Sequence, residues 1–547
     1  MSLRAFLLAL LASVTASGLL VLALRRFLTP PESFSLIFDT SAARQRNGWA
    51  DFWARDPFVR AHRERTGFAF GTYSVPGGES IATHFAASDL HQHNVVLGAT
   101  GMGKSSLLEA MARFHLQEHR PFALFDLHGD LFTRVAGWAI AAKPEHLVLL
   151  DFTRPDLLPT WNPLLPIPGV DAGRHVDMLV SVFKRLYADE IAASWAWGPK
   201  IEELTRYALR ACIESATPMS LVDLPSFFLI PAVRERVVRT ASPRTQQFFD
   251  KQFKKDEERY DSAVLNKFEP FLGSTAVQRF LGAPTSSFDL LGAMDRGDTL
   301  LVNLPRGYMG LTADVMGRLL VSFLQLAALR RERIAPPHRK PYTLLMDEAH
   351  VLAGNESGLE EFLVAGRKYK VYATLAAQAL SLFRPQTRPH LLGNTTGQFF
   401  FRLPYAEARA LAPDVLEPLG SIFREQERPH DSVDDPLLTT SEEIAWRTRE
   451  LASLPVGACY WVTKGRPYKG RRIRILPPLD LPYSDAELRR RIDRAMAERK
   501  GTPSVADCAP EESAVQQAFA AAIAERSARR ESRLLEEANR STPPASL

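Results

Sequence analysis

The chain has 547 residues, and 46% of them are hydrophobic, which excludes an intrinsically disordered protein and leaves room for about two to four domains. A net charge of +5 and an isoelectric point near 9.0 allow nucleic-acid or anionic-membrane partners without requiring either. The cysteines, Cys212, Cys459 and Cys508, lie far apart and form no C-x-x-C pair, which excludes a disulfide framework or a zinc site of that type and fits a reducing compartment.

The first segment, residues 1–30, contains a long apolar stretch. Residues 5–24 carry no charge and, at about 1.5 Å per residue, are long enough to cross a bilayer core of roughly 30 Å. Arg4 precedes the stretch, and Arg25 and Arg26 follow it. We expect a single transmembrane anchor here, whose orientation the charges do not fix. A cleaved signal peptide is the alternative, because residues 14–17 are rich in small side chains.

A strand–helix alternation follows the anchor. Residues 31–90 form a connector and a β-rich start, with short strands expected at 68–73 and 80–85. In segment 91–170, apolar runs at 94–97, 121–126 and 146–151 alternate with helical stretches. This rhythm predicts an α/β fold with a parallel sheet and crossover helices.

The sequence directly after the run at 94–97 matches G-x-x-x-x-G-K-[ST], the phosphate-binding P-loop. Its glycines let backbone N–H groups surround phosphate oxygens at a helix N-terminus. We expect Lys104 to reach the β- and γ-phosphates of ATP and Ser105 to bind Mg²⁺. The expected nucleotide-binding residues are Gly98, Ala99, Thr100, Gly101, Met102, Gly103, Lys104, Ser105 and Ser106. Because ATP is supplied in the cytosol, the motif favours an uncleaved anchor with the bulk of the chain in the cytoplasm.

The alternation is interrupted by a helical region at 171–285, which predicts an all-α domain inserted into the α/β domain. The α/β pattern resumes at 286–480, and a charged helical, partly disordered tail is expected at 481–547. A basic stretch in the insertion could contact DNA phosphates, but a solvated helix face is the simpler interpretation. Trp195 and Trp197 could stack on bases, although buried core positions are more common for tryptophan. The basic residues are Arg234, Arg236, Arg239, Arg244, Lys251, Lys254 and Lys255.

An apolar run at 342–346 ends in two acids, Asp347 and Glu348. Such a pair after a strand supplies the second half of a P-loop site: Asp347 would hold Mg²⁺, and Glu348 would polarise the attacking water. A helix-capping role is the alternative. Glu109 and Asp126 are competing acids, but Asp126 is not followed by a second acid.

Two further positions are candidates for catalytic roles. Gln378 ends the apolar run at 373–377 and could sense the γ-phosphate or cap the next turn. Arg367 lies just before that run and is a candidate arginine finger that acts on the nucleotide of a neighbouring subunit. A cation at a helix C-terminus, which the helix dipole favours, is the alternative for Arg367.

These motifs resemble those of the conjugative coupling ATPases of type IV secretion systems, the TraG/TraD group within the FtsK/HerA class of P-loop translocases. Order and spacing agree from about residue 90 to 405. Members of that family often carry two transmembrane helices, where this sequence shows one. The matching pieces are residues 98–105, 126–130, 161–164, 345–350 and 366–369, with Gln378 and with Asn394 ahead of a late strand.

The resemblance implies a hexameric ring motor with a RecA-like P-loop domain, in which the arginine at the position of Arg367 acts in trans. It also implies non-specific DNA binding, secretion-channel proteins and relaxase-type cargo as partners, and the bacterial inner membrane as the location. The catalytic set would then be Lys104, Glu348, Arg367 and Gln378, with ATP and Mg²⁺ as cofactors. A related ATPase for protein secretion or pilus assembly and a nucleotide-gated scaffold with little turnover are the alternatives.

Overall fold

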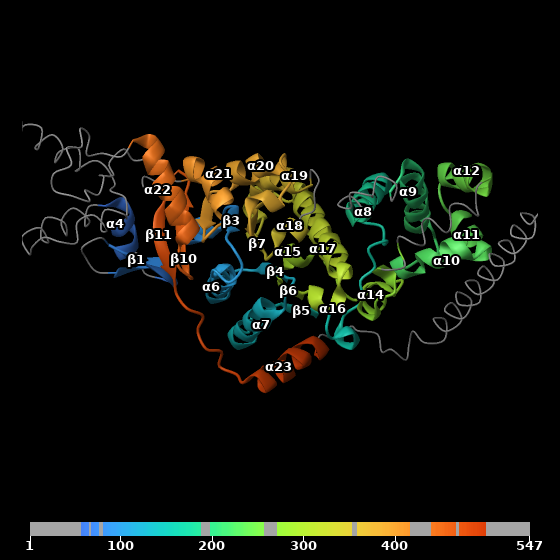
Figure 1. Cartoon of the computed structure of the whole chain (residues 1–547). Helices are drawn as coiled ribbons and strands as arrows, with labels where there is room; N and C mark the ends of the chain where they lie inside the picture. The colour runs from blue at the N-terminus through green and yellow to red at the C-terminus, as the bar shows by residue number, and fades with distance from the viewer. Residues whose placement is uncertain are drawn as a thin grey trace, which may run out of the picture. The chain divides into compact units, whose positions relative to one another are not determined.

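The computed structural model divides the chain into two compact units, and it describes most residues between 56 and 498 (Figure 1). The described residues are 56–64, 67–75, 80–186, 197–255, 268, 271–352, 358–415, 439–465 and 470–498. The expected anchor at 1–30, Trp195 and most of the tail lie outside them. Unit 1 comprises Met1–Leu124, Arg331–His350 and Ser357–Pro482; unit 2 comprises Phe125–Arg330, Val351–Glu356 and Tyr483–Leu547.

Unit 1 contains a mixed sheet whose strands follow the order β2-β1-β11-β10-β9-β3-β8-β7. β9, β3, β8 and β7 are parallel, and β10, β11, β1 and β2 extend the sheet as antiparallel strands. The run of parallel strands agrees with the parallel-rich sheet that the sequence predicts, whereas the antiparallel extension was not predicted. The strands are β1 (Ala69–Ser74), β2 (Ser80–His84), β3 (Asn94–Leu97), β7 (Tyr342–Met346), β8 (Val371–Ala377), β9 (Gly397–Phe400), β10 (Ala458–Thr463) and β11 (Arg471–Ile475).

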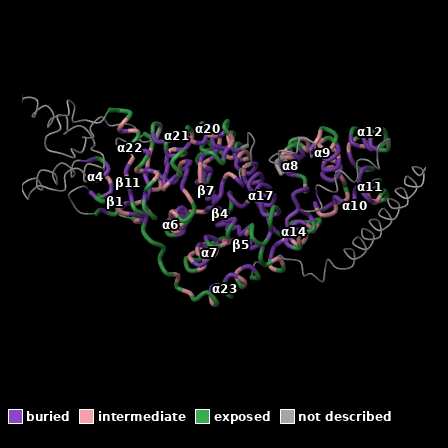
Figure 2. The backbone as a smooth tube through the Cα atoms, viewed as in Figure 1, coloured by how far each residue is buried: buried purple, intermediate pink, exposed green. Residues whose placement is uncertain are grey.

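The parallel strands form the core of unit 1. Every residue of β3, β7, β8 and β9 is buried, as Figure 2 shows by colour. Strands covered on both faces read as continuous apolar runs, which is why the sequence revealed them without an alternating pattern. The helices of this unit are α4 (Pro57–Arg63), α5 (Ala87–Leu90), α6 (Lys104–Gln117), α19 (Gly358–Ala365), α20 (Thr387–Asn394), α21 (Tyr405–Val415) and α22 (Thr440–Ser453).

Unit 2 contains parallel strands β5 (Leu147–Asp151) and β6 (Thr299–Asn303) and the helical region between them. β4 (Phe122–Asp126) and α18 (Ala349–Leu352) span the division between the units. The helices of the unit are α7 (Asp130–Ala142), α8 (Ala172–Leu186), α9 (Pro199–Glu214), α10 (Leu224–Leu229), α11 (Pro231–Val238), α12 (Pro243–Lys251), α14 (Thr275–Leu281), α15 (Ala293–Arg296), α16 (Arg306–Met309), α17 (Leu311–Arg330) and α23 (Asp485–Ala497).

The Trp-Asn-Pro motif at 161–163 joins the helical region to the chain after β5. The Trp161 N–H donates to the Phe280 carbonyl at 2.7 Å, and the Asn162 amide donates to the carbonyls of Met219 and Pro284, each at 2.9 Å. A buried asparagine that satisfies carbonyls from separate segments fixes their arrangement. We therefore assign this motif a structural role.

Among the described residues, one helical stretch, Leu311–Arg333, is long and apolar enough to cross a membrane. Its most apolar window is 89% buried inside the protein, as in the core helix of a globular unit. The sequence-based division of the chain into six segments stays a prediction.

Candidate functional site

The P-loop lies between the end of β3 and the start of α6, as the sequence predicted. Gly101 and Gly103 have φ angles of +76° and +111°, which other residues rarely adopt. A Cβ atom at Gly98 would lie 2.4 Å from Cβ of Phe401, so this position has no room for a side chain. These glycines thus give the loop the backbone that phosphate binding requires.

Lys104 begins α6 and is 6% exposed. Its ammonium donates to the carbonyls of Gly98 at 2.7 Å and Ala99 at 3.2 Å. Burial lowers the pKa of Lys104, and the carboxylates of Asp347 and Glu348 oppose that shift. The lysine is therefore a buried cation held between its own loop and the acidic pair.

Asp347 directly follows β7 and meets the P-loop. The Ser105 hydroxyl donates to Oδ2 of Asp347 at 3.3 Å, and Asp347 is 4% exposed. A hydroxyl and a carboxylate at this separation form the oxygen pair that Mg²⁺ prefers. The two residues therefore fit a magnesium ion, although their role stays a prediction.

Glu348 has a left-handed backbone with φ of +50°, which is unusual for a residue other than glycine. Its N–H donates to Oδ1 of Asp347 at 3.1 Å. The Gln378 amide donates to Oε1 of Glu348 at 3.0 Å, and His350 Nδ1 lies 3.5 Å from Oε2. Strained residues that are held by several partners are common at functional sites. The sequence predicted that Gln378 lies near the site, but gave no signal for His350 beyond its place in the motif.

Arg367 lies at the other end of β8 from Gln378. It is exposed in the 3-10 turn Gly366–Tyr369, just before β8, whereas Gln378 follows that strand. Seven strand residues span roughly 23 Å. The structure thus brings together Lys104, Ser105, Asp347, Glu348 and Gln378, and it separates Arg367 from them.

The competing acids have other surroundings. The Asp126 carboxylate accepts N–H groups from His128, Gly129 and Phe132 at 2.8–2.9 Å, so it stabilises the start of α7. Glu109 is buried on α6, where it lines a small cavity of about 70 Å³ with Arg113. The contacts of Asp347 with Ser105 and of Glu348 with Gln378 favour that pair as the hydrolytic acids.

The residues that the sequence suggested for nucleic-acid contact are partly buried and partly exposed in the structure. Arg234 is 8% exposed, donates to the Phe228 carbonyl at 2.9 Å and lies 4.7 Å from the Phe253 ring centroid, so it belongs to the helical core. Trp197 is also buried. The exposed basic residues of this stretch are Arg236, Arg239, Arg244, Lys251 and Lys254.

Arg402 is a P-loop neighbour that the sequence reasoning missed. Its carbonyl accepts the Ala99 N–H at 2.8 Å, and its Nε donates to the Met102 sulfur at 2.9 Å. Gly457 also reaches the loop, since its N–H donates to the Met102 carbonyl at 3.0 Å. β9 runs parallel to β3, so residues that follow β9 lie beside the P-loop. A correct strand order would have revealed Arg402.

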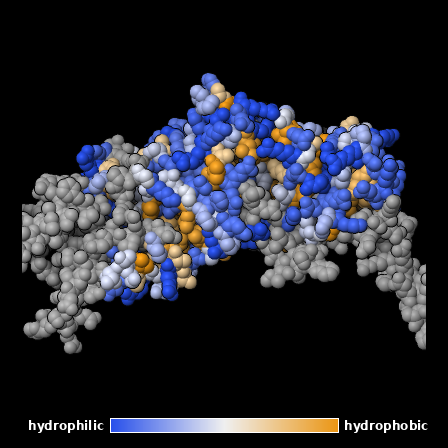
Figure 3. All heavy atoms as spheres, turned by 90° about the horizontal axis from the view of Figure 1, so that it is seen from above, coloured by the Kyte–Doolittle hydropathy of each residue, from blue (hydrophilic) through white to orange (hydrophobic). Residues whose placement is uncertain are grey.

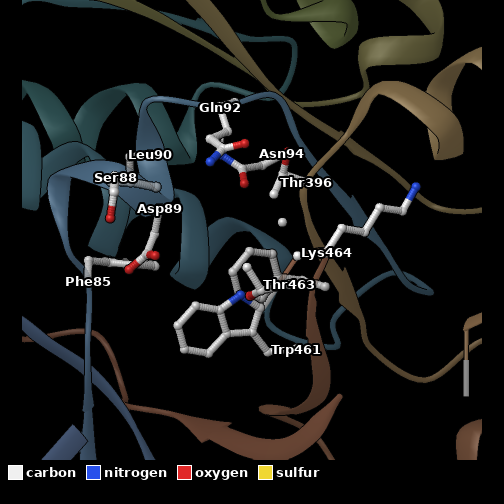
Figure 4. Close-up of a pocket in the computed structure, with 13 residues that line it drawn as sticks. Phe85, Ser88, Asp89, Leu90, Gln92, Asn94, Thr396, Trp461, Thr463 and Lys464 are labelled. Atoms are coloured by element: carbon white, nitrogen blue, oxygen red, sulfur yellow. Dashed lines mark hydrogen bonds between the residues drawn. The ribbon is translucent and has the colours of Figure 1, made fainter. Parts of the chain in front are cut away.

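A larger cavity, of about 330 Å³, lies at the opposite edge of the parallel strands (Figure 4). Gln92 and Asn94 line one side, and Trp461 and Thr463 line the other. Asn94 is the first residue of β3, whereas the P-loop follows its last residue. This cavity is therefore distinct from the P-loop site.

No protein-family model matches the sequence, and a search of curated proteins gives no match. Solved structures with a similar fold include the bacterial conjugative coupling protein TrwBdeltaN70, with 14% identity and a TM-score of 0.53, covering 78% of this chain and 92% of that one. The plasmid coupling protein TrwB in complex with ADP and Mg²⁺ gives 15% identity and a TM-score of 0.52, covering 78% and 93%. Its complex with a non-hydrolysable ATP analogue gives 16% and 0.50, covering 78% and 91%. The chain thus shares the mixed α/β P-loop fold of this coupling protein.

Proposed function

We propose that this chain is a membrane-anchored, ATP-hydrolysing DNA translocase of the conjugative coupling type, which delivers DNA to a type IV secretion channel. The contact between Ser105 and Asp347 at 3.3 Å carries the ATPase part, because it joins the P-loop to the acidic pair. The fold shared with the coupling protein TrwB supports the DNA and secretion part. The anchor is proposed from residues 1–30 alone.

The residues of the site suggest a division of labour. The Lys104 ammonium would bind β- and γ-phosphate oxygens in place of its loop carbonyls, and the loop N–H groups would bind the same anion. Ser105 and Asp347 would hold Mg²⁺, which neutralises charge that develops on the phosphates. Glu348 would orient the attacking water and accept its proton, while the Gln378 amide holds the carboxylate in place.

The site would be completed by a neighbouring subunit in a ring. Arg367 is exposed at the edge opposite its own P-loop, where it can meet the γ-phosphate of the next copy. Each edge also carries an exposed apolar side chain: Val364 precedes Arg367, and Val456 precedes Gly457 at the P-loop. A head-to-tail contact that buries both would close a cyclic assembly, which we propose is a hexamer. The face of the described residues in Figure 3 is mostly hydrophilic, with several hydrophobic patches.

The proposal is tested by ATPase assays of the full chain in detergent. Turnover should rise when duplex or single-stranded DNA is added at low salt and fall back as salt increases, because phosphate contacts are salt-sensitive. Lys104→Ala should abolish turnover under all conditions and serves as the control. Turnover that does not change when DNA is added at low salt would contradict the proposed DNA motor and favour an ATPase that moves protein.

A further inference from the structure

Two buried arginines, Arg331 and Arg339, bind the turn that carries Arg367, and they are 1% and 6% exposed. Both lie in the segment that leads into β7, the strand that ends at Asp347. Arg339 donates through Nη1 to the Lys368 carbonyl at 2.7 Å, and Arg331 donates through Nη1 to the Tyr369 carbonyl at 3.3 Å. Two guanidinium groups thus bind the two carbonyls that follow Arg367.

The same arginines are fixed on their own segment. Arg339 Nε donates to the carbonyls of Arg331 at 3.0 Å and Ile334 at 2.8 Å, and Arg331 Nη1 donates to Lys340 at 2.8 Å. The Arg339 guanidinium also lies 5.3 Å from the Tyr369 ring centroid. Charge-assisted bonds are strong, and a buried cation becomes costly once its partners move away. The turn therefore has one favoured position.

The other side of the turn is closed by His93 and Gly366. His93 Nδ1 accepts the Ala373 N–H at 3.0 Å, so its ring is fixed against β8. A Cβ atom at Gly366 would lie 2.9 Å from the Val371 carbonyl oxygen and 3.3 Å from Cε1 of His93. Burial lowers the pKa of His93 to about 3, so its ring is uncharged at neutral pH. Only a glycine fits here, and the turn cannot shift toward the sheet.

We propose that Arg331 and Arg339 are positioning residues that hold the exposed Arg367 in the orientation it needs to reach a neighbouring subunit's nucleotide. The inference rests on the proposed function, because it gives Arg367 a role in trans. An exposed long side chain is mobile by itself, and burying two guanidinium groups against one short turn restricts its base. Misplacing a reacting group by about 1 Å can cost roughly 100-fold in rate.

The test compares Arg339→Met with Arg333→Met, which changes an exposed arginine of the preceding 3-10 turn. Single-turnover hydrolysis by the full chain, with enzyme in excess, should slow roughly 10- to 100-fold in Arg339→Met and stay within twofold in Arg333→Met. Affinity for a non-hydrolysable ATP analogue should stay within twofold in both, because Arg339 lies at the edge opposite its own P-loop.

The decisive measurement repeats Arg339→Met in an Arg367→Ala background. If Arg339 acts through Arg367, the second substitution should cause no further slowing, whereas a multiplicative loss would overturn the proposal and indicate a general structural role. If Arg367→Ala alone leaves turnover unchanged, the proposed trans site is itself wrong. If Arg367→Ala abolishes turnover but Arg339→Met does not slow it, only the positioning role fails. Should Arg339→Met not fold, Arg339→Lys carries the same comparison.

Discussion

The two edges of the parallel strands in unit 1 differ in what they offer a nucleotide. At one edge, Lys104, Ser105, Asp347, Glu348 and Gln378 come from three elements and contact one another within hydrogen-bonding distance or close to it. At the other edge, the exposed Arg367 lies on a turn whose carbonyls accept hydrogen bonds from the buried Arg331 and Arg339. We propose that the first edge holds most of a hydrolytic site and that Arg367 of a neighbouring subunit completes it.

This difference supports the proposal that the site is formed by two copies of the chain. A loop, a strand end and a helix start can bring acids and a lysine together within one subunit. A rigid strand of seven residues prevents its two ends from meeting. Because Arg367 precedes β8 and Gln378 follows it, the two side chains of one subunit cannot meet at one nucleotide.

The largest expected effect is on the ATPase rate when Arg367, at the arginine edge, is replaced. Arg367→Ala should lower the ATPase rate by about 10³-fold or more, since an arginine finger contributes roughly 10³–10⁵. Lys368→Ala, at the exposed neighbouring cation, is the matched control and should change the rate little. Steady-state hydrolysis at saturating ATP measures both. Equal losses in the two variants would show that the turn matters only for its charge or folding.

The next largest effect is on turnover when Glu348, at the P-loop edge, is replaced. Glu348→Gln should reduce turnover by roughly 10²–10⁴-fold while ATP binding is retained, because the amide cannot accept a proton from water. Glu109→Gln, at a buried acid of α6, is the control. Binding of a fluorescent ATP analogue and phosphate release separate the two functions. If Glu109→Gln stops hydrolysis and Glu348→Gln does not, the acidic pair has been assigned wrongly.

A smaller effect concerns the amide that holds the acid. Gln378→Ala removes a hydrogen bond to the Glu348 carboxylate that is worth about 1.5 kcal/mol, so turnover should fall roughly tenfold. The effect should vanish in the Glu348→Gln background if the amide acts by holding that carboxylate. A persistent tenfold loss there would instead indicate direct contact of Gln378 with the γ-phosphate, which is the role expected from sequence.

The smallest effect concerns the acid sensitivity that the buried His115 gives the fold. Burial, together with the nearby His91 and Arg120, lowers the pKa of His115 to about 3, whereas its ordinary value is 6.5. Between these values the unfolded chain binds the proton more readily, so stability should fall as pH drops below about 6.5. Between pH 7.5 and pH 5, the melting temperature of the His115→Phe variant should fall less than that of the parent protein. An identical pH dependence in the two proteins would contradict this cause.

The sequence predicted those features that depend on neighbours along the chain. The P-loop needs only glycines, lysine and serine at fixed spacing, and the acidic pair needs only an apolar run before it. The strands at 68–73, 80–85 and 94–97 are confirmed to within one or two residues. These signals are local, so one sequence carries them.

The features that the sequence did not reveal depend on the order of strands. Arg402 lies beside Met102 only because β9 is the neighbour of β3, and the antiparallel extension of the sheet follows from the same order. Arg331 and Arg339 have no motif, because their partners are backbone carbonyls, which any residue provides. Tertiary pairing determines these contacts, and no local pattern records it.

Mixing two inactive variants tests most directly whether one site is built from two subunits. Chains with Lys104→Ala lack the P-loop lysine but keep Arg367, and chains with Arg367→Ala have the reverse defect. Where the P-loop edge of an Arg367→Ala subunit meets the arginine edge of a Lys104→Ala subunit, a complete site forms. We expect that co-assembled mixtures regain ATPase activity that neither variant shows alone. Mixtures that stay inactive at every ratio, although the variants co-assemble, would contradict it.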